Sequence, residues 1–288
     1  MNDMERCVRP LTCPICHDGL TRKGNRLACP QGHSFDLARE GYVNLLPTNR
    51  RLPPTVGDSA EMLQARRRFL DGGHYAPLAA RLPQVMQEWA TTLNRAAPLT
   101  LLDCGCGEGY YGEWVRGALA GSGVCSFGMD VAKTAVKMAA RRYPHTQFVA
   151  ADVNGRLPFA DQSIDLLLDI FAPRHAAEFG RVVSGALLAV IPRQAHLHSL
   201  RQALGLLNIE VDKAEKVVEG LRPYFQLAHT ETLTFPLALT PSQLVDLIGM
   251  TPNGRHLSRT QIEAMAGSAP ETEASFQILV LRHMKRDA

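Results

Sequence analysis

Four residues near the start of this chain have the types and spacing of zinc ligands. Cys13 and Cys16 form a C-x-x-C turn, and Cys29 and His33 follow after twelve intervening residues. Three thiolates and an imidazole can surround Zn²⁺ tetrahedrally, and such donors favour zinc over harder cations. Four protein ligands leave no coordination position for a substrate, so the spacing predicts a structural zinc site. A module this small has too little hydrophobic core to fold without a bound metal.

Other arrangements of these residues stay open at this point. The cysteines could be reduced thiols in a loop without metal, or His17 or Cys7 could replace His33 as the fourth ligand. The prolines and the glycine between the ligands fit the tight turns around bound thiolates, which favours the metal.

A glycine-rich turn is the second feature with a defined chemistry. A buried strand is predicted at 99–103, ending in Asp103, and Gly105, Gly107 and Gly109 follow it. Residues 107–112 formally satisfy the dinucleotide pattern G-x-G-x-x-G, but in that pattern the first glycine directly follows the strand. An acid at the strand end would repel a pyrophosphate and suits a cationic cofactor. The turn is similar to the first motif of class I methyltransferases, which use S-adenosylmethionine (SAM).

Acids also end the next two predicted strands. Asp130 closes the strand at 124–130, where its carboxylate can accept hydrogen bonds from both ribose hydroxyls of SAM. Asp152 follows the strand at 146–151, where it can accept a hydrogen bond from the adenine amine while the N–H of Val153 reaches the ring. Three acidic strand ends in register with a glycine turn argue against an NAD enzyme and against an α/β domain without a ligand.

The order of predicted elements indicates an α/β fold. Strands alternate with helices from residue 99 to residue 191, and two more strands are predicted at 227–237 and 275–282. This alternation predicts a doubly wound, mostly parallel sheet. Together with the similarity of the glycine turn to the class I motif, it leads us to expect a class I SAM-dependent methyltransferase fold with a Rossmann-like, mostly parallel seven-stranded sheet and a small amino-terminal zinc-binding module. We expect the zinc-binding module at 1–46, a proline-containing linker at 47–58 and the methyltransferase domain at 59–288.

Composition limits the class of protein further. The 288 residues are 45% hydrophobic and 20% charged, which allows a full core, and no run approaches the roughly 18 apolar residues of a membrane span. The seven cysteines include C-x-x-C and C-x-C pairs rather than a disulfide framework, and there is no secretory signal, so we expect a cytoplasmic protein without a membrane partner. Basic residues, including Arg66–Arg68, gather in the first third of the chain and suit a polyanion.

The chain resembles a known family nearly from end to end. The resemblance rests on the two zinc-ligand turns, the glycine turn and the segments 35–47 (FDLAREGYVNLLP), 57–70 (GDSAEMLQARRRFL), 73–75 (GHY) and 171–173 (FAP). These residues resemble the type A family of bacterial 23S ribosomal RNA guanine-N1 methyltransferases, which includes macrolide-resistance members. The chain departs from the usual sequence of this family at 182–186 and 253–255. The resemblance therefore does not identify the residues of the base pocket or the target nucleotide.

The resemblance implies further properties. Zinc would be held by the four residues named above, and SAM would be contacted by Tyr75, Gly107, Glu108 and His196. The protein would be a homodimer whose zinc modules form part of a cleft for a hairpin of 23S ribosomal RNA. The implied reaction is SAM-dependent methylation of guanine N1. A small-molecule methyltransferase and a SAM-binding, RNA-binding protein without catalysis remain the alternatives.

Catalytic groups are expected in the loop after the fourth strand. Guanine N1 must lose its proton during methyl transfer, which needs a general base or stabilisation of the anion at O6. Asp169 or His175 could be the base, and Arg174 could hold O6 or a phosphate. Phe171 could stack on a flipped guanine. Equally, Asp169 could face a helix, His175 could begin one, and Phe171 could pack against the sheet.

Overall fold

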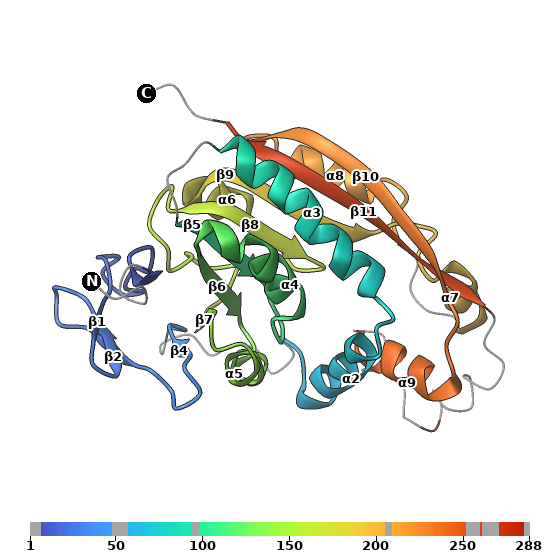
Figure 1. Cartoon of the computed structure of the whole chain (residues 1–288), viewed down its shortest axis with the longest axis horizontal. Helices are drawn as coiled ribbons and strands as arrows, with labels where there is room; N and C mark the ends of the chain where they lie inside the picture. The colour runs from blue at the N-terminus through green and yellow to red at the C-terminus, as the bar shows by residue number, and fades with distance from the viewer. Residues whose placement is uncertain are drawn as a thin grey trace.

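An eight-stranded sheet forms the centre of the molecule, and a three-stranded sheet lies beside it near the amino terminus (Figure 1). The computed structural model describes residues 7–47, 57–93, 98–204, 209–251, 260 and 271–284. The strands are β1 (Thr21–Lys23), β2 (Arg26–Ala28), β3 (Ser34–Asp36), β4 (Val43–Asn44), β5 (Leu99–Cys104), β6 (Val124–Asp130), β7 (Gln147–Ala150), β8 (Ile164–Ile170), β9 (Val183–Pro192), β10 (Phe225–Leu237) and β11 (Thr272–His283). The helices are α2 (Ala60–Asp71), α3 (Ala76–Thr92), α4 (Tyr110–Leu119), η1 (Ala120–Ser122), α5 (Lys133–Arg142), α6 (Ala176–Val182), α7 (His198–Leu204), α8 (Lys213–Leu221) and α9 (Pro241–Gly249).

The large sheet has the strand order β10-β11-β9-β8-β5-β6-β7-β4. All neighbours from β9 to β4 pair in parallel, and only β11 runs against its two neighbours. The mostly parallel α/β fold predicted from the sequence is therefore confirmed. The chain passes from β5 outward to β6 and β7 and then returns to β8, so the switch point lies between β5 and β8, where sheets of this type bind ligands.

Successive side chains of the central strands pack on opposite faces of the sheet. On β9, Leu187 and Ala189 belong to a buried cluster that includes Phe179 of α6, whereas Leu188 and Val190 belong to a second cluster with α3 and α4. Figure 1 shows α3 and α4 in front of the sheet and α6 and α8 behind it. Burial on both faces explains the nearly continuous apolar sequences of β8 and β9.

The zinc-binding module is built onto the large sheet. Its strand β4 pairs with β7 and adds an eighth strand to the seven expected from the sequence. The backbone N–H of Thr12 donates to the carbonyl of Pro158 over 2.9 Å, and Leu11 shares a buried cluster with Phe159. The turns that carry Cys13 and Cys29 therefore share one buried core with the large sheet. Within the linker expected at 47–58, residues 48–56 lie outside the described ranges.

A disulfide joins Cys7 to Cys125 on β6. The sequence predicted no disulfide framework, and it did not indicate this bridge, because Cys7 and Cys125 are far apart in sequence and adjacent only in the fold. Cys13, Cys16, Cys29, Cys104 and Cys106 are free.

Helix α2 illustrates how the local sequence sets an element's ends. The hydroxyl of Ser59 accepts a hydrogen bond from the N–H of Met62, as expected of an N-cap, and Gly72 follows the last turn. After β9 the chain forms two helices, α7 and α8, and residues 205–208 between them lie outside the described ranges. Among the helices that the structure describes, none has the length and hydropathy to span a bilayer.

Candidate active site and metal centre

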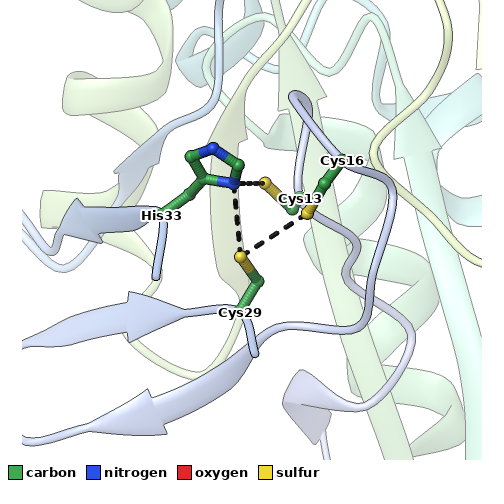
Figure 2. A group of neighbouring side chains, drawn as sticks. All are labelled: Cys13, Cys16, Cys29 and His33. Carbon is green, nitrogen blue, oxygen red and sulfur yellow. Dashed lines mark hydrogen bonds between the residues drawn. The ribbon is translucent and has the colours of Figure 1, made fainter. Parts of the chain in front are cut away.

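The four predicted zinc ligands converge on one point. Figure 2 shows the side chains of Cys13, Cys16, Cys29 and His33 directed toward one another. Their ligand atoms all lie within 4.8 Å of one another, with Cys16 Sγ 3.5 Å from Cys29 Sγ and Cys29 Sγ 3.4 Å from His33 Nδ1. Bonds of about 2.3 Å to sulfur and about 2.0 Å to nitrogen place tetrahedral ligands about 3.5–3.8 Å apart. The donor set and its spacing therefore fit Zn²⁺.

Two tight turns present these ligands. The N–H of Ile15 donates to Cys13 Sγ over 3.4 Å, and Gly32, at a φ of +87°, closes the turn between Cys29 and His33. His17 and Cys7, the alternative fourth ligands, are outside the cluster, and Cys7 is held in the disulfide. The geometry therefore favours His33.

A cavity of about 700 Å³ lies at the switch point of the sheet, at the carboxyl ends of β5, β6, β7 and β8. It is lined by every residue that the sequence assigned to SAM, namely Tyr75, Asp103, Gly105, Gly107, Glu108, Asp130, Asp152, Val153 and His196. These residues come from five separate segments, and only the parallel sheet brings them together. Their contacts with SAM itself stay a prediction.

The glycine turn is shaped for close approach to a ligand. Gly105 has a φ of +79°, and a Cβ atom at this position would lie 2.4 Å from the Cβ of Ala172. The N–H of Gly107 donates to Asp130 Oδ2 over 2.9 Å, and the N–H of Ala132 donates to Asp130 Oδ1 over 2.8 Å. Each carboxylate oxygen keeps a second lone pair, so Asp130 is held in place and can still accept bonds from two hydroxyls.

Two neighbouring carboxyls give the cavity an affinity for positive charge. Burial, and then the proximity of Asp130, raises the pKa of Asp103 to about 7. Burial also raises the pKa of Asp130, although two backbone N–H groups oppose this shift. A cationic ligand would stabilise the ionised form of both groups. The carboxyl pair, together with the turn beside it, therefore fits the sulfonium and ammonium groups of SAM.

SAM affinity should consequently rise with pH. The ionised form of Asp103 binds a cation more tightly, so the dissociation constant should fall as pH rises through about 7. From pH 5.5 to pH 7 we expect a gain of roughly tenfold. Calorimetric titration of SAM at several pH values measures this, and proton release on binding should accompany it. Asp103→Asn should flatten the profile, and an unchanged slope in that variant would contradict the assignment.

Tyr75, which is buried, and His196, which is half-buried, form a pair that lines the cavity. Tyr75 Oη lies 3.4 Å from His196 Nε2, and the N–H of Ser275 donates to His196 Nδ1 over 3.2 Å. Burial lowers the pKa of His196 to about 3, so the ring is neutral. Because Nδ1 accepts a hydrogen bond, the ring proton resides on Nε2, which leaves His196 without a free site to act as a base.

Arg66, from the Arg66–Arg68 run of α2, lines the cavity, and all three arginines make ion pairs. Arg66 Nη1 lies 2.5 Å from Asp58 Oδ2, and Nη2 donates to the carbonyl of Met250 over 3.2 Å. Arg67 is ion-paired with Glu108, and Arg68 Nη2 lies 2.6 Å from Asp246 Oδ1 of α9. These arginines hold α2 against the glycine turn and α9. Each of these arginines has an acidic partner within the chain, which accounts for this structural role. Contact with an RNA polyanion stays a prediction.

The loop after β8 occupies the acceptor side of the cavity. Phe171 has a φ of +57° and is 42% exposed, and its ring contacts those of Tyr111 and Phe276. A non-glycine residue held at positive φ is strained, which is common at functional sites. An exposed ring at the cavity suits the stacking role predicted for Phe171, which stays a prediction.

The two residues predicted as general bases are placed differently. Asp169 is fully buried, its carboxylate is ion-paired with Arg174, and it is not among the cavity-lining residues, whereas Arg174 is. Burial raises the pKa of Asp169 to about 7 despite Arg174. His175 also does not line the cavity; its Nδ1 accepts a hydrogen bond from the N–H of Glu178 and caps α6. Asp169 therefore contacts Arg174, and His175 begins a helix. The role of either residue as a general base stays a prediction.

Several cavity residues were not predicted from the sequence. They come from α2 and the segment before it, from α7, α8 and α9, from the end of β9 and from β11, and they include Asp58, Leu70, Pro192, Leu200, Arg201, Lys213, Leu247, Met250 and Phe276. Some lie in segments quoted for the resemblance, but neither strand-end position nor motif marked them as lining residues.

The chain is similar to known proteins over most of its length. Residues 11–52 match the family model described as "RlmA, N-terminal", and residues 101–193 match a methyltransferase domain. A relative from Streptomyces fradiae named 23S rRNA (guanine(748)-N(1))-methyltransferase is 36% identical over 91% of this chain and 92% of its own length. A relative from Micromonospora griseorubida, whose name assigns it to the 23S rRNA (guanine-N(1)-)-methyltransferases, is 38% identical over the same shares.

Solved structures resemble the chain less closely. The plantazolicin methyltransferase BpumL, solved with S-adenosylhomocysteine, is 12% identical over 77% of this chain and 90% of its own, with a TM-score of 0.45. A likeness of this size says nothing about the substrate.

Proposed function

The chain belongs to the 23S rRNA (guanine-N1)-methyltransferase family, and we propose that it transfers the methyl group of SAM to N1 of a guanine in a hairpin of 23S ribosomal RNA. One observation carries the proposal. The chain combines a Cys₃His module of this family with a cavity whose carboxyls, Asp103 and Asp130, favour a cationic ligand. The cofactor is SAM, the zinc is structural, and the nucleotide that receives the methyl group has to be mapped.

The residues of the cavity divide into two functional sides. Asp103 and Asp130 attract the cationic cofactor, and the glycine turn allows close backbone approach. On the acceptor side, Phe171 offers a stacking surface, and Arg174 is held by Asp169. SAM supplies an activated methyl group, so positioning and charge stabilisation account for the protein's share of catalysis.

Loss of the N1 proton is assisted by positive charge in this proposal. Attack by N1 on the methyl carbon forms a C–N bond as the C–S bond breaks, and the N1 proton leaves to solvent. Arg174 lines the acceptor side as a guanidinium, which can stabilise negative charge at O6 as the proton leaves. Neither predicted base lines the cavity, which favours this route over a direct proton acceptor among the described residues.

The alternatives account for fewer features of the chain. A small-molecule methyltransferase would need only the cavity and would leave the Cys₃His module without a role. A SAM-binding protein without catalysis would not need an open acceptor side lined by Phe171 and Arg174. For these reasons we propose the RNA methyltransferase.

The decisive experiment measures transfer of labelled methyl from SAM to 23S ribosomal RNA from a strain that lacks its own enzyme. We expect 1-methylguanosine in nucleoside mass spectrometry of the product RNA. Transfer of label to a small-molecule extract instead would support the small-molecule alternative. Zinc and SAM binding without any transfer would support the non-catalytic one.

The location and assembly of the protein follow from this proposal. We place it in the cytoplasm, where its RNA substrate resides, and propose that it acts as a homodimer whose zinc modules help to hold the hairpin. Lys23 and Arg26 are exposed on the β1–β2 hairpin and are available to RNA phosphates. Light scattering of the purified protein tests the dimer, and a monomeric mass would refute it.

A further inference from the structure

Three cationic side chains meet at the acceptor side of the cavity. Arg174 comes from the loop after β8, Arg201 from α7 and Lys213 from the start of α8, and all three line the cavity together with Phe171 and His196. Only their packing in the fold brings them together.

Arg201 is buried with an unused hydrogen-bond donor. It is 5% exposed, its Nε donates to the carbonyl of His196 over 2.9 Å, and Nη2 donates to the carbonyl of Gln194. Its Nη1 is buried and has no hydrogen-bond partner within the described parts of the chain. Arg201 lines the cavity, two carbonyls fix its guanidinium, and its Nη1 is unpaired, so it can donate to an anionic ligand.

Lys213 adds charge that the described residues only partly balance. Burial, and then the nearby Arg174, lowers the pKa of Lys213, while Glu210 opposes this shift. The carboxylate of Glu210 lies 2.9 Å from Nζ of Lys216, and Asp169 is ion-paired with Arg174. Of the three cations that line the cavity, only Arg174 has an ion pair of its own, with Asp169, among the described residues. A bound anion would reduce the repulsion between the three positive charges.

The anion could be the carboxylate of SAM or a phosphate of the RNA. The cofactor side already has a cation of its own, because Arg66 Nη1 lies 3.2 Å from where a Cβ on Gly107 would be. Arg174 belongs to the same loop as Phe171, the stacking surface proposed for the base, and Lys213 is near enough to Arg174 for their charges to interact. This arrangement favours a ligand that enters with the base.

We propose that Arg201 and Lys213, together with Arg174, bind a backbone phosphate next to the target guanosine. The proposal rests on the RNA methyltransferase function proposed above and assigns these residues to positioning. The bound phosphate fixes the flipped nucleotide, so the site selects a nucleotide within a chain over a free base or nucleoside.

The test combines a lysine variant with a neutral RNA linkage. The substrate is a synthetic 23S hairpin with a methylphosphonate linkage on the 5′ or the 3′ side of the target guanosine, compared with a phosphodiester hairpin carrying the same sugars. One of the two linkages should lower kcat/KM of the unaltered enzyme by about 10- to 100-fold, as expected for a charge-assisted hydrogen bond. On the phosphodiester RNA, Lys213→Met should lower kcat/KM by about the same factor as the neutral linkage does. On the methylphosphonate RNA, the variant should have nearly the same kcat/KM as the unaltered enzyme, and its KM for SAM should be unchanged.

A matched control lies one turn further along the same helix. Lys216 is 58% exposed and pairs with Glu210 and Asp212, so Lys216→Met should keep the full response to the neutral linkage. Arg201→Met provides a second test, and Lys213→Met carries the experiment if the arginine variant fails to fold.

Other outcomes would overturn the proposal. If the losses in kcat/KM from Lys213→Met and from the neutral linkage multiply at both linkage positions, Lys213 and the phosphate act independently. If Lys213→Met raises only the KM for SAM, the cations bind the cofactor carboxylate. No 1-methylguanosine from the unaltered enzyme on phosphodiester RNA would instead refute the proposed function, and this inference with it.

Discussion

Gly105→Ala is expected to weaken SAM binding by about 100-fold or more. The residue has a φ of +79°, and an added Cβ would lie 2.4 Å from the Cβ of Ala172 in the loop after β8. A left-handed conformation costs an ordinary residue about 1–2 kcal/mol, and relieving the clash must also move the turn or the loop. The N–H of Gly105 donates to the carbonyl of Met129 over 2.7 Å, so a shift would also disturb the link to β6. Calorimetric titration with SAM measures the loss.

Gly117→Ala is the matched control for this substitution. Gly117 lies within α4, and a Cβ there would meet no atom within 4 Å. We expect unchanged SAM affinity and a thermal midpoint equal to or slightly above that of the parent, because alanine is the better helix former. Normal SAM binding by Gly105→Ala would show that the turn tolerates a side chain and would contradict the proposed close approach.

The cofactor side of the cavity could be predicted from the sequence, because short sequence patterns determine where its residues lie. A strand ending in Asp103, a glycine turn and a second strand ending in Asp130 are all visible as short patterns. Parallel strands bring their carboxyl ends to one edge of a sheet, so these acids had to meet there. The structure places them around one cavity as expected.

The residues of the acceptor side could not be predicted from the sequence in this way. Arg201 and Lys213 lie on short helices that no strand-end pattern positions, and their approach to Arg174 depends on how those helices pack. The same limit applies to Cys7 and Cys125, whose sulfurs meet across a sequence separation of 118 residues. For His175, two hypotheses fitted the sequence equally well, and only the contact with Glu178 favours the helix cap.

Loss of a zinc ligand is expected to have the second large effect. Cys29→Ser should reduce the bound zinc from one equivalent to nearly none, since the site has four ligands and no spare donor among the described residues. Structural zinc contributes about 10–16 kcal/mol to the folding of isolated zinc-finger peptides. Because Cys29 and Leu11 share a buried cluster with Phe159, disorder in the module would reach the large sheet. Losing even about 3 kcal/mol should lower the thermal midpoint by roughly 6–12 °C.

The control variant uses the histidine that competes with His33 in the sequence. His17 has a φ of +66° and lies outside the ligand cluster, and asparagine tolerates that conformation, so His17→Asn should keep its zinc and its thermal midpoint. His33→Ala should behave like Cys29→Ser. Atomic absorption gives the metal content and calorimetry the midpoint. Zinc loss from His17→Asn with retention by His33→Ala would reverse the assignment of the fourth ligand, whereas zinc loss without a change in midpoint would show that the module folds apart from the sheet that β4 extends.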